Sequence, residues 1–435
     1  MSASDDAPTP ISTPTPTPTP TFRSNLSEER TDSSESRVEV GRAGVGVEVG
    51  RAGVGVEAGR AGERQSPLHT EHLALGATVV PYAGWLMPLR YTSDLAEHHA
   101  VRSAAGLFDL SHMGEIRISG PGAAAALDAA LVGWLSALAV GRARYTMICA
   151  QDGGVIDDLV VYRVGDQEFL VVANAANSEV VLAELHARCD AAATVTDESV
   201  ATALIAVQGP AALGIVASVL PDAAQRAAVV GLPYYAATAA AVAGVPAMVA
   251  RTGYTGEDGF ELFVAVERAA EVWRAVLAAG QDVGIVPAGL ACRDSLRLEA
   301  GMPLYGNELD RTTTPYDAGL GRVVRLDKTD ADGLAVEFVG RGPLTGRANS
   351  EPARLLVGLE GLGRRVARHG YPVLRDGVTV GRVTSGAPSP TLGHPIAMAY
   401  VTPEVSAAGT ELDVDVRGRA EPVRVVPLPF YRRTS

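Results

Sequence analysis

One segment of the chain combines closely spaced glycines with acidic and aromatic side chains. From Arg251 to Glu261 it reads Arg-Thr-Gly-Tyr-Thr-Gly-Glu-Asp-Gly-Phe-Glu. Glycines at this density do not suit the interior of a helix or strand, and they predict a backbone that a flat polar ligand can approach closely. Glu261 lies at the start of an alternating apolar run typical of a strand, which would hold its carboxylate rigidly. A carboxylate accepts two hydrogen bonds at once, which suits a pterin or a guanine. A glycine-rich hairpin with solvated acids explains the segment equally well.

A second segment, Gly153 to Val164, places two acids inside an apolar run that predicts a strand. Alternate side chains of a strand share a face, so Asp158 lies on the same face as Tyr162 and its apolar neighbours. A charge on that face costs free energy unless a partner or a ligand meets it, and aspartate is disfavoured in strands. We therefore interpret Asp158 as functional, with Arg163 available as an ion-pair partner for Asp157. The alternative is that both acids close a bulge where the strand begins.

A third group of charges lies on a helix predicted over Ala288 to Ala300. Arg293 and Arg297 are four residues apart and share a face of this helix. Small residues precede Arg293, so a carboxylate-bearing or heterocyclic ligand can reach its guanidinium group and form two parallel hydrogen bonds. An intramolecular pair with Asp294 or Glu299 is at least as compatible with the sequence.

Other polar residues carry weaker signals. Asn174 and Asn177 follow a predicted strand, Phe169 to Ala173, where asparagine usually makes turn hydrogen bonds. Neither His112 nor the adjacent pair His98 and His99 has a second cluster of ligands at metal-binding spacing. The sequence therefore predicts no metal site.

Composition excludes several classes of protein. The net charge is −13 and no dense block of basic residues is present, so we expect no nucleic-acid partner. No apolar run reaches the length of a membrane span, and the first residues lack the pattern of a secretory signal, so we expect no membrane association. The three cysteines lack Cys-x-x-Cys spacing, which argues against disulfides or structural zinc and predicts a reducing, cytoplasmic location.

The single lysine of the chain excludes two further classes. Lys328 lies in Arg-Leu-Asp-Lys-Thr-Asp, with no glycine before it, so it does not belong to a P-loop. We interpret it as a loop charge, and therefore not as the desolvated lysine that pyridoxal phosphate requires.

The chain divides into three parts by composition. Residues 1–66 contain a Thr-Pro repeat and a glycine-rich nine-residue repeat, and we expect this low-complexity extension to be disordered. The middle part mixes strands with helices predicted over 121–139, 267–279 and 288–300, which indicates an α+β fold. A loop over 326–340 marks a boundary. After it, short strands separated by Gly/Pro turns predict a small β-barrel; they cover residues 355–359, 379–384, 396–401, 411–416 and 422–426.

Taken together, these motifs resemble the T-protein of the glycine cleavage system, the family of tetrahydrofolate-dependent aminomethyltransferases. The similar stretches occur in family order over residues 67–433. They are 82–88, 106–115, 153–162, 208–210, 251–261, 291–301, 384–393 and 429–431.

The resemblance implies a three-domain cloverleaf around a central folate channel, in which two intertwined α+β domains cover residues 67–335 and the C-terminal β-barrel covers 345–433. It also implies roles for individual residues. Asp158 would be the catalytic acid beside the reacting nitrogens of the folate. The implied folate-binding residues are Glu261, Arg293, Tyr254, Asn174, Tyr145, Met113 and Tyr431.

The chemistry implied by the resemblance requires two partners. An aminomethyl group would arrive on the dihydrolipoyl arm of a separate, lipoylated H-protein, and tetrahydrofolate would accept the one-carbon unit as a co-substrate while ammonia leaves. Neither a metal nor pyridoxal phosphate is implied.

Two alternatives share the same fold. A folate-dependent demethylase of the dimethylglycine or sarcosine oxidase type would carry an additional flavin-binding domain, and the sequence shows no Rossmann fingerprint. Non-enzymatic, folate-binding iron–sulfur assembly proteins use a Lys-Gly-Cys-Tyr type segment where this chain has Arg251 to Tyr254. Both differences favour the aminomethyltransferase.

Overall fold

The computed structural model describes residues 63–189 and 191–433. The predicted disordered extension therefore lies almost entirely outside the described residues. Its boundary was placed slightly too late, because Arg64–Gln65 forms strand β1 and pairs in parallel with β3 (Trp85–Arg90). Ser66 is buried and donates a hydrogen bond to Asp109, so the folded part begins before residue 67.

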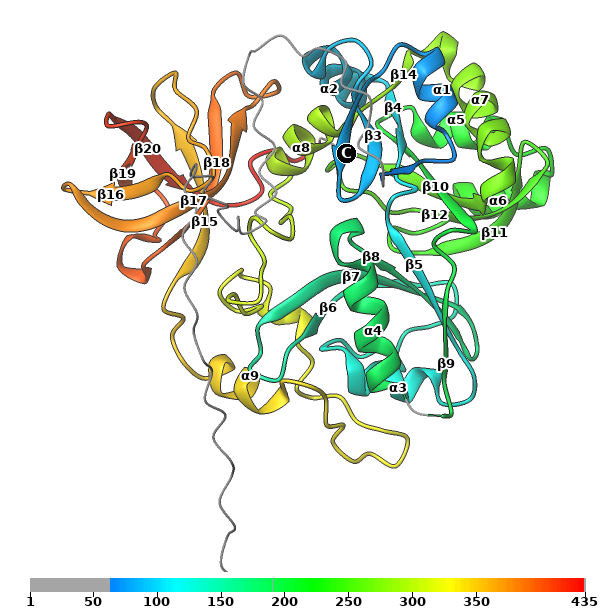
Figure 1. The fold of residues 1–435 in the computed structure, drawn as a ribbon, viewed down its shortest axis with the longest axis horizontal. Helices are drawn as coiled ribbons and strands as arrows, with labels where there is room; N and C mark the ends of the chain where they lie inside the picture. Colours follow the sequence, from blue (N-terminus) through cyan, green and yellow to red (C-terminus); the bar gives the residue numbers. More distant parts are fainter. Residues whose placement is uncertain (1–62, 190, 434–435) are drawn as a thin grey trace, which may run out of the picture. The chain divides into compact units, whose positions relative to one another are not determined.

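Strands of the described residues form three open sheets and a closed barrel (Figure 1). The three-stranded sheet has the order β1-β3-β2, with β2 at Thr78–Tyr82. The six-stranded sheet has the order β11-β12-β13-β10-β4-β14. These strands are β11 (Ala237–Val242), β12 (Val245–Ala250), β13 (Gly259–Ala265), β10 (Thr202–Gln208), β4 (Ala105–Asp109) and β14 (Ile285–Pro287).

In the sequence, the strands of the five-stranded sheet lie between two strands of the six-stranded sheet, β4 and β10. Its order is β6-β7-β8-β5-β9, and its strands are β6 (Ala143–Cys149), β7 (Val155–Gly165), β8 (Glu168–Ala173), β5 (Gly114–Ser119) and β9 (Thr194–Asp197). The chain leaves the six-stranded sheet after β4 and returns to it at β10. The mixed α+β fold is thus confirmed, with the two sheets interleaved along the sequence.

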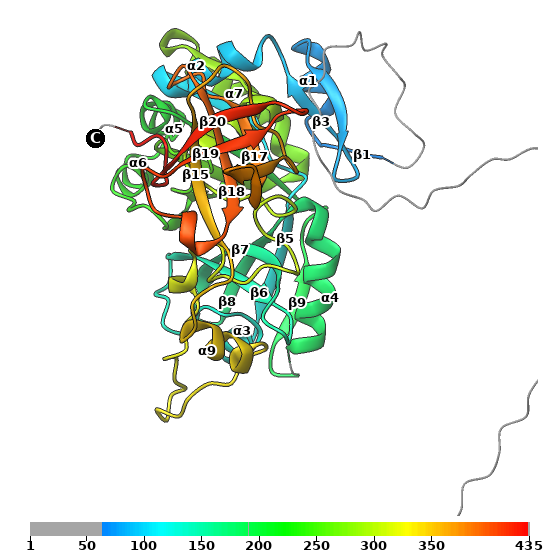
Figure 2. The same cartoon turned by 90° about the vertical axis from the view of Figure 1, so that its left-hand side faces the viewer.

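Helices cover the sheets. Those of the described residues are α1 (His69–Ala74), α2 (Asp94–Ser103), α3 (Ala123–Ala130), α4 (Ser178–Arg188), α5 (Ala212–Ser218), α6 (Ala223–Val230), α7 (Ala269–Ala279), α8 (Leu290–Glu299) and α9 (Arg341–Ala348), with short 3-10 turns η1 (Ala175–Asn177), η2 (Val266–Arg268), η3 (Gln281–Val283), η4 (Gly321–Val323) and η5 (Pro403–Val405). Helix α4 runs along the five-stranded sheet in both views (Figures 1 and 2). None of these helices is long and apolar enough to cross a membrane.

Helix α3 is shorter than the sequence predicted. It ends at Ala130 instead of continuing to residue 139, and Lys328 caps its C-terminal end. The ammonium group of Lys328 donates to the backbone carbonyls of Asp128, Leu131 and Gly133, the last two at 2.6 and 3.0 Å. Unpaired carbonyls and the helix dipole both favour a cation at this position. Our interpretation of Lys328 as a loop charge was wrong, since its side chain is fully buried.

The two larger sheets pack against each other through a shared apolar layer. This layer contains Phe108 and Leu204 from the six-stranded sheet and Tyr162 and Leu170 from the five-stranded sheet. The rings of Tyr162 and Phe263 meet edge to face at 5.6 Å, an arrangement that aromatic pairs prefer. The layer fixes the separation of β7 and β13, the strands that carry Asp158 and Glu261.

The C-terminal part is a closed six-stranded barrel, as predicted. Its strands follow the order β15-β18-β17-β16-β19-β20 and are β15 (Leu355–Gly361), β18 (Pro395–Val401), β17 (Val378–Pro388), β16 (Pro372–Arg375), β19 (Glu411–Asp415) and β20 (Ala420–Val426). Each predicted strand coincides with one of them. Strand β16 was missed because it is short and begins with proline, which is atypical of a strand interior.

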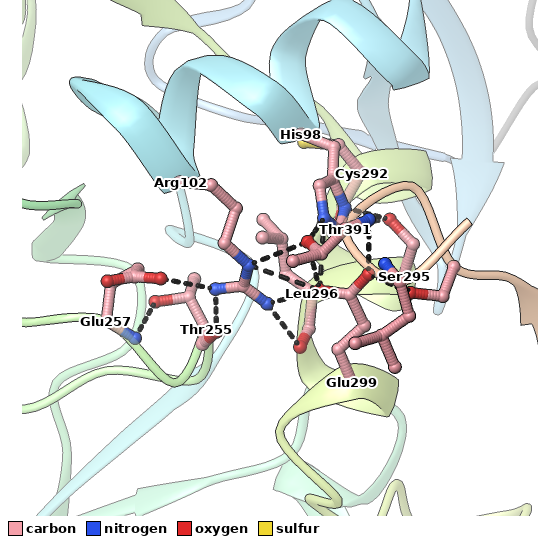
Figure 3. Close-up of polar contacts among 11 residues, drawn as sticks. His98, Arg102, Thr255, Glu257, Cys292, Ser295, Leu296, Glu299 and Thr391 are labelled. Atoms are coloured by element: carbon pink, nitrogen blue, oxygen red, sulfur yellow. Dashed lines mark hydrogen bonds and ion pairs between the residues drawn. The ribbon is translucent and has the colours of Figure 1, made fainter. Parts of the chain in front are cut away.

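A buried polar network ties the barrel to helices α2 and α8 (Figure 3). Glu299 at the end of α8 lies 2.8 Å from Arg102 and 3.1 Å from His98, both on α2. Ser389 and Thr391, just after β17, donate hydrogen bonds to the same carboxylate at 2.5 and 2.7 Å. Burial opposes the charge of Glu299, but the hydrogen bonds from His98 and Ser389 and the charge of His98 outweigh it and lower its pKa to about 2. The network therefore depends on an ionised Glu299.

Candidate active site

A large cavity brings together most of the residues proposed from the sequence. Its volume is about 2720 Å³, and it is lined by residues of both larger sheets, of α8 and of the barrel. The proposed site residues that line it are Asp158, Glu261, Arg293, Tyr254, Asn174, Tyr145 and Met113. Tyr431 is not among the lining residues; its ring lies 4.1 Å from the guanidinium group of Arg102.

Asp158 is held on β7 by two side chains. The Tyr145 hydroxyl donates to Oδ2 at 2.9 Å, and the Asn174 side-chain amide donates to Oδ1 at 2.9 Å. Burial raises the pKa of Asp158, although the hydrogen bonds from Tyr145 and Asn174 oppose that effect. A carboxyl group with a pKa raised toward neutrality is suited to accept and return a proton. Strand parity predicted correctly that this side chain emerges on the face of Tyr162.

The neighbouring Asp157 is fully buried on the opposite face. Asn174 donates to it through both its backbone N–H and its side chain, at 3.0 and 2.9 Å, and Asn177 donates at 3.0 Å. Burial and the charge of Asp158 raise the pKa of Asp157. The expected ion pair with Arg163 was wrong, because that guanidinium group donates to backbone carbonyls. The turn interpretation of the two asparagine side chains was also wrong, since both bind this carboxylate.

Glu261 is held within β13, as the sequence predicted. Its Oε2 accepts hydrogen bonds from Thr252 Oγ1 at 2.5 Å and from the Tyr162 hydroxyl at 3.2 Å. Within the described part of the chain, Oε1 receives no hydrogen bond, and the side chain lines the cavity. One oxygen is therefore anchored and the other is available to a ligand with an N–H donor.

The glycines of the segment 251–261 bring the backbone close to Gln208, and Gly253 also lines the cavity. Gln208 lies between Gly253 and Gly259, where an added Cβ would come within 1.9 Å of its Oε1 and 2.3 Å of its Nε2 respectively. The Gln208 amide donates to the Thr252 carbonyl at 3.0 Å and accepts from Thr255 at 2.9 Å. The backbone therefore approaches a side chain of the protein itself at these two glycines, and Gln208 shapes the segment that carries Glu261.

The two arginines of α8 have separate environments. Arg297 is buried and pairs with Asp294 at 2.8 Å and with Glu308 at 2.9 Å. Both arginines line the cavity, but the guanidinium group of Arg293 forms no ion pair within the described residues and lies 4.8 Å from the ring centre of Tyr254. The ion pair with Asp294, which was the alternative to a ligand role for Arg293, is thus formed by Arg297.

Sequence reasoning missed several residues of the cavity wall. His112 is buried and meets the ring of Tyr82 edge to face at 5.6 Å; burial lowers its pKa to about 4, so it is neutral at pH 7. Tyr162, Tyr235 and Thr252 also line the cavity. Strand parity with Asp158 was the signal that pointed to Tyr162. No group of three or more His, Cys, Asp or Glu side chains suited to a metal ion occurs in the part of the chain described.

Two family profiles match the chain. The GCVT N-terminal domain covers residues 68–328, and the glycine cleavage T-protein C-terminal barrel domain covers residues 354–432.

Curated relatives agree with these matches. The aminomethyltransferase of Saccharopolyspora erythraea is 59% identical over 374 residues, which cover 86% of this chain and 99% of that protein. The aminomethyltransferase of Streptomyces coelicolor is 58% identical over 375 residues, 85% of this chain and 98% of that protein.

A solved structure is similar over the same region. The crystal structure of glycine cleavage system aminomethyltransferase T from Bartonella henselae has a TM-score of 0.76 at 34% identity, covering 85% of this chain and 98% of that one. The demethylase and the iron–sulfur assembly alternatives are not favoured by these findings. The chain belongs to the glycine cleavage T-protein family of aminomethyltransferases.

Proposed function

We propose that this enzyme transfers a one-carbon unit from the aminomethyl-dihydrolipoyl arm of an H-protein to tetrahydrofolate, forming 5,10-methylene-tetrahydrofolate with release of ammonia and of the reduced dihydrolipoyl arm. The observation that carries the proposal is that Asp158 and Glu261, on strands of two different sheets, line one cavity. A reduced pterin presents adjacent N–H donors on one edge and its reacting nitrogen elsewhere. Two separate carboxylates suit these two parts of the molecule.

Glu261 and Arg293 would bind the folate. The free Oε1 of Glu261 accepts from the N–H donors of the pterin, and charge-assisted bonds of this kind are about twice as strong as neutral ones. Arg293 and Tyr254, already in contact with each other, form one wall against which a flat ring can stack. Tyr145, Asn174 and Met113 complete the wall near Asp158.

Asp158 would act on the proton at the reacting nitrogen. Tetrahydrofolate supplies the nucleophilic nitrogen that takes up the carbon. The Asp158 carboxylate orients the hydrogen on that nitrogen, accepts it, and returns it to the dihydrolipoyl thiolate that departs when the C–S bond breaks. It also stabilises the positive charge that develops as ammonia leaves. Holding both reactants in one cavity supplies proximity, which removes much of the entropic cost of a two-substrate reaction.

A separate carrier is consistent with the positions of the cysteines. Cys149 and Cys292 are buried, and none of the three cysteines lines the cavity. This arrangement supports delivery of the aminomethyl group on the sulfur of another molecule, such as a flexible lipoyl arm.

The test is a reconstitution. The purified protein is mixed with aminomethylated H-protein and tetrahydrofolate, and ammonia release is followed over time. We expect release only when all three components are present, and none with H-protein that lacks the lipoyl arm. Failure of the complete mixture to release ammonia above the two-component controls would refute the proposal.

A further inference from the structure

Three polar side chains of the cavity wall make no hydrogen bond to the protein. They are Tyr82 at the end of β2, His112 in the loop between β4 and β5, and Arg293 in α8, and all three line the cavity. Among the residues that the structure describes, none donates to or accepts from the Tyr82 hydroxyl, the His112 ring nitrogens or the Arg293 guanidinium group, and Nδ1 of His112 is buried in this state. We call these three residues the unpaired cluster.

The residue assigned to proton transfer differs in this respect. Both oxygens of Asp158 accept hydrogen bonds, from Tyr145 and from Asn174. Buried polar groups in native structures generally have partners, and one that lacks a partner calls for an explanation. A ligand that supplies the missing hydrogen bonds explains the unpaired cluster.

The three members of the unpaired cluster face the same part of the cavity. The rings of Tyr82 and His112 meet edge to face, with their centres 5.6 Å apart. Arg293 is near enough for its charge to act on both. Burial is the main cause of the lowered pKa of His112, and the charge of Arg293 lowers it further; burial raises the pKa of Tyr82, and the same charge opposes that rise.

The acids whose charges reach this cluster are bound elsewhere. The carboxylate of Asp109 lies 2.8 Å from His72 Nε2 and accepts the backbone N–H of Ser111 at 2.9 Å. Asp294 pairs with Arg297 at 2.8 Å. The cluster itself therefore offers a ligand one cation and two neutral groups, an environment that disfavours an ammonium ion.

A neutral nitrogen compound matches the hydrogen-bonding groups of the cluster. A neutral imidazole has one nitrogen that accepts a hydrogen bond, whereas a guanidinium group only donates and a tyrosine hydroxyl can do both. Ammonia has N–H donors and a single lone pair, so His112 can accept from it while Tyr82 or Arg293 donates to its lone pair. No residue has yet been assigned to the nitrogen that leaves in the proposed reaction.

We propose that His112, Tyr82 and the N–H edge of Arg293 form a subsite for the amine of the aminomethyl group and for the ammonia that it becomes. This inference rests on the proposed function. As the C–N bond breaks, the amine takes up one of the two protons that the folate nitrogens lose and departs as neutral NH3; the other proton goes to the thiolate. In the reverse direction, the same subsite binds NH3 as the nucleophile.

The experiment measures the reverse reaction. Dihydrolipoyl H-protein, 5,10-methylene-tetrahydrofolate and increasing ammonium chloride are mixed with the enzyme without oxygen, and mass spectrometry follows the aminomethylated H-protein. The variants are His112→Leu, His112→Gln, which restores a polar side chain, and Tyr82→Phe, which removes only a hydroxyl. His69→Leu is the control, because His69 is another histidine of the cavity wall outside the cluster.

We expect the KM for ammonia to rise about 3- to 10-fold in His112→Leu and in Tyr82→Phe, as the loss of one neutral hydrogen bond predicts. His112→Gln should recover part of the loss, and His69→Leu should keep the wild-type KM. The Kd for tetrahydrofolate, measured by titration calorimetry without turnover, should stay unchanged in all four variants. That Kd also shows whether each variant is correctly folded.

A wild-type KM for ammonia in either His112→Leu or Tyr82→Phe, with folate binding intact, would overturn the inference. A KM for ammonia and a Kd for tetrahydrofolate that rise together would assign the cluster to the folate and overturn it as well. If His112→Leu does not fold, Tyr82→Phe decides the question. A wild-type enzyme that forms no aminomethylated H-protein would instead refute the proposed function, so the two failures are distinguishable.

Discussion

The Tyr145 hydroxyl group lies 2.9 Å from Oδ2 of Asp158 and donates a hydrogen bond to it, while Asn174 occupies Oδ1. Both oxygens of the carboxylate are therefore oriented before any substrate enters. Because hydrogen bonds to a charged group favour the charged form, this pair of donors opposes the rise in the pKa of Asp158 that burial causes.

Replacing Asp158 with asparagine keeps the shape of the side chain but removes its charge and its capacity to accept a proton. General acid–base contributions are about 10²- to 10⁴-fold, so we expect kcat to fall by that factor. The Kd for tetrahydrofolate should change little, since Glu261 and Arg293 remain. Ammonia release and calorimetry measure the two effects. Asp166→Asn, in the exposed turn before β8, is the control, and turnover at the wild-type level in Asp158→Asn would remove this residue from the reaction.

Tyr145→Phe removes the donor to Oδ2 and should change the pH dependence. The hydrogen bond from Tyr145 lowers the pKa of Asp158, so its loss raises that pKa. If the ionised carboxylate is the active form, the acidic limb of the kcat profile moves to higher pH, by roughly half to one unit for a hydrogen bond of about 1 kcal/mol. Tyr235→Phe is a matched control, because Tyr235 lines the same cavity and no hydrogen bond joins it to Asp158. A limb that stays in place or moves to lower pH contradicts the assignment.

Glu261→Gln should weaken folate binding more than turnover. The change replaces a charge-assisted acceptor with a neutral one, worth about 1.5–3 kcal/mol, so we expect the Kd for tetrahydrofolate to rise about 10- to 100-fold. The value of kcat at saturating folate should fall only slightly. The control is Glu267→Gln, an exposed residue of η2. An unchanged Kd would show that Glu261 is not part of the binding site.

Lys328→Met tests the buried cap of α3. It leaves three backbone carbonyls without their donor, which we expect to cost about 1–3 kcal/mol of unfolding free energy. Arg325→Met removes an exposed pair with Asp327 and should cost less than about 1 kcal/mol. Chemical denaturation measures both, and equal costs in the two variants would contradict a capping role for Lys328.

The same lysine should also give a pH signature. Burial lowers the pKa of Lys328 to about 7, whereas the unfolded chain keeps a value near 10.4. Between those pH values the unfolded state binds more protons, so stability from this group rises with pH. The slope of the unfolding free energy against pH between about 7 and 10 should be smaller in Lys328→Met than in the wild type.

Glu299→Gln tests the network that attaches the barrel. Removing one partner of a buried ion pair costs roughly 3–5 kcal/mol, because Arg102 and His98 lose the charge that they surround. The folded-state pKa of Glu299 lies well below its ordinary value, so this stability is present above that ordinary value and is lost as the pH falls toward 2. Thermal unfolding and limited proteolysis of the barrel check the result against the exposed control Glu404→Gln, and equal stability of the two variants would rule out such a role for Glu299.

The sequence supported predictions where local periodicity determines the outcome. The alternation in β7 and in the barrel strands follows from the two-residue repeat of a strand, and it placed Asp158 on the correct face. The strand setting of Glu261 followed from the same pattern. These features need no knowledge of distant parts of the chain.

Features that depend on distant contacts were beyond sequence reasoning. The carbonyl groups that accept hydrogen bonds from the buried Lys328 lie 195 to 200 residues earlier in the sequence. The residues next to Lys328 in the sequence do not indicate its burial. The side chains of Asn174 and Asn177 reach back across the sheet to Asp157, in place of the local turn bonds that asparagine usually makes. The stacking of Tyr431 on Arg102 likewise joins segments far apart in the chain.

The apolar layer between the two larger sheets has one further consequence. Asp158 and Glu261 belong to different sheets. The distance between them therefore depends on the size of the side chains that pack between the sheets, and no loop can adjust it. Small residues such as Ala206 and Ala250 in that layer act as spacers. Replacing one with a larger residue would increase the distance between Asp158 and Glu261, so that the two carboxylates no longer match the length of the co-substrate, although neither acid is changed.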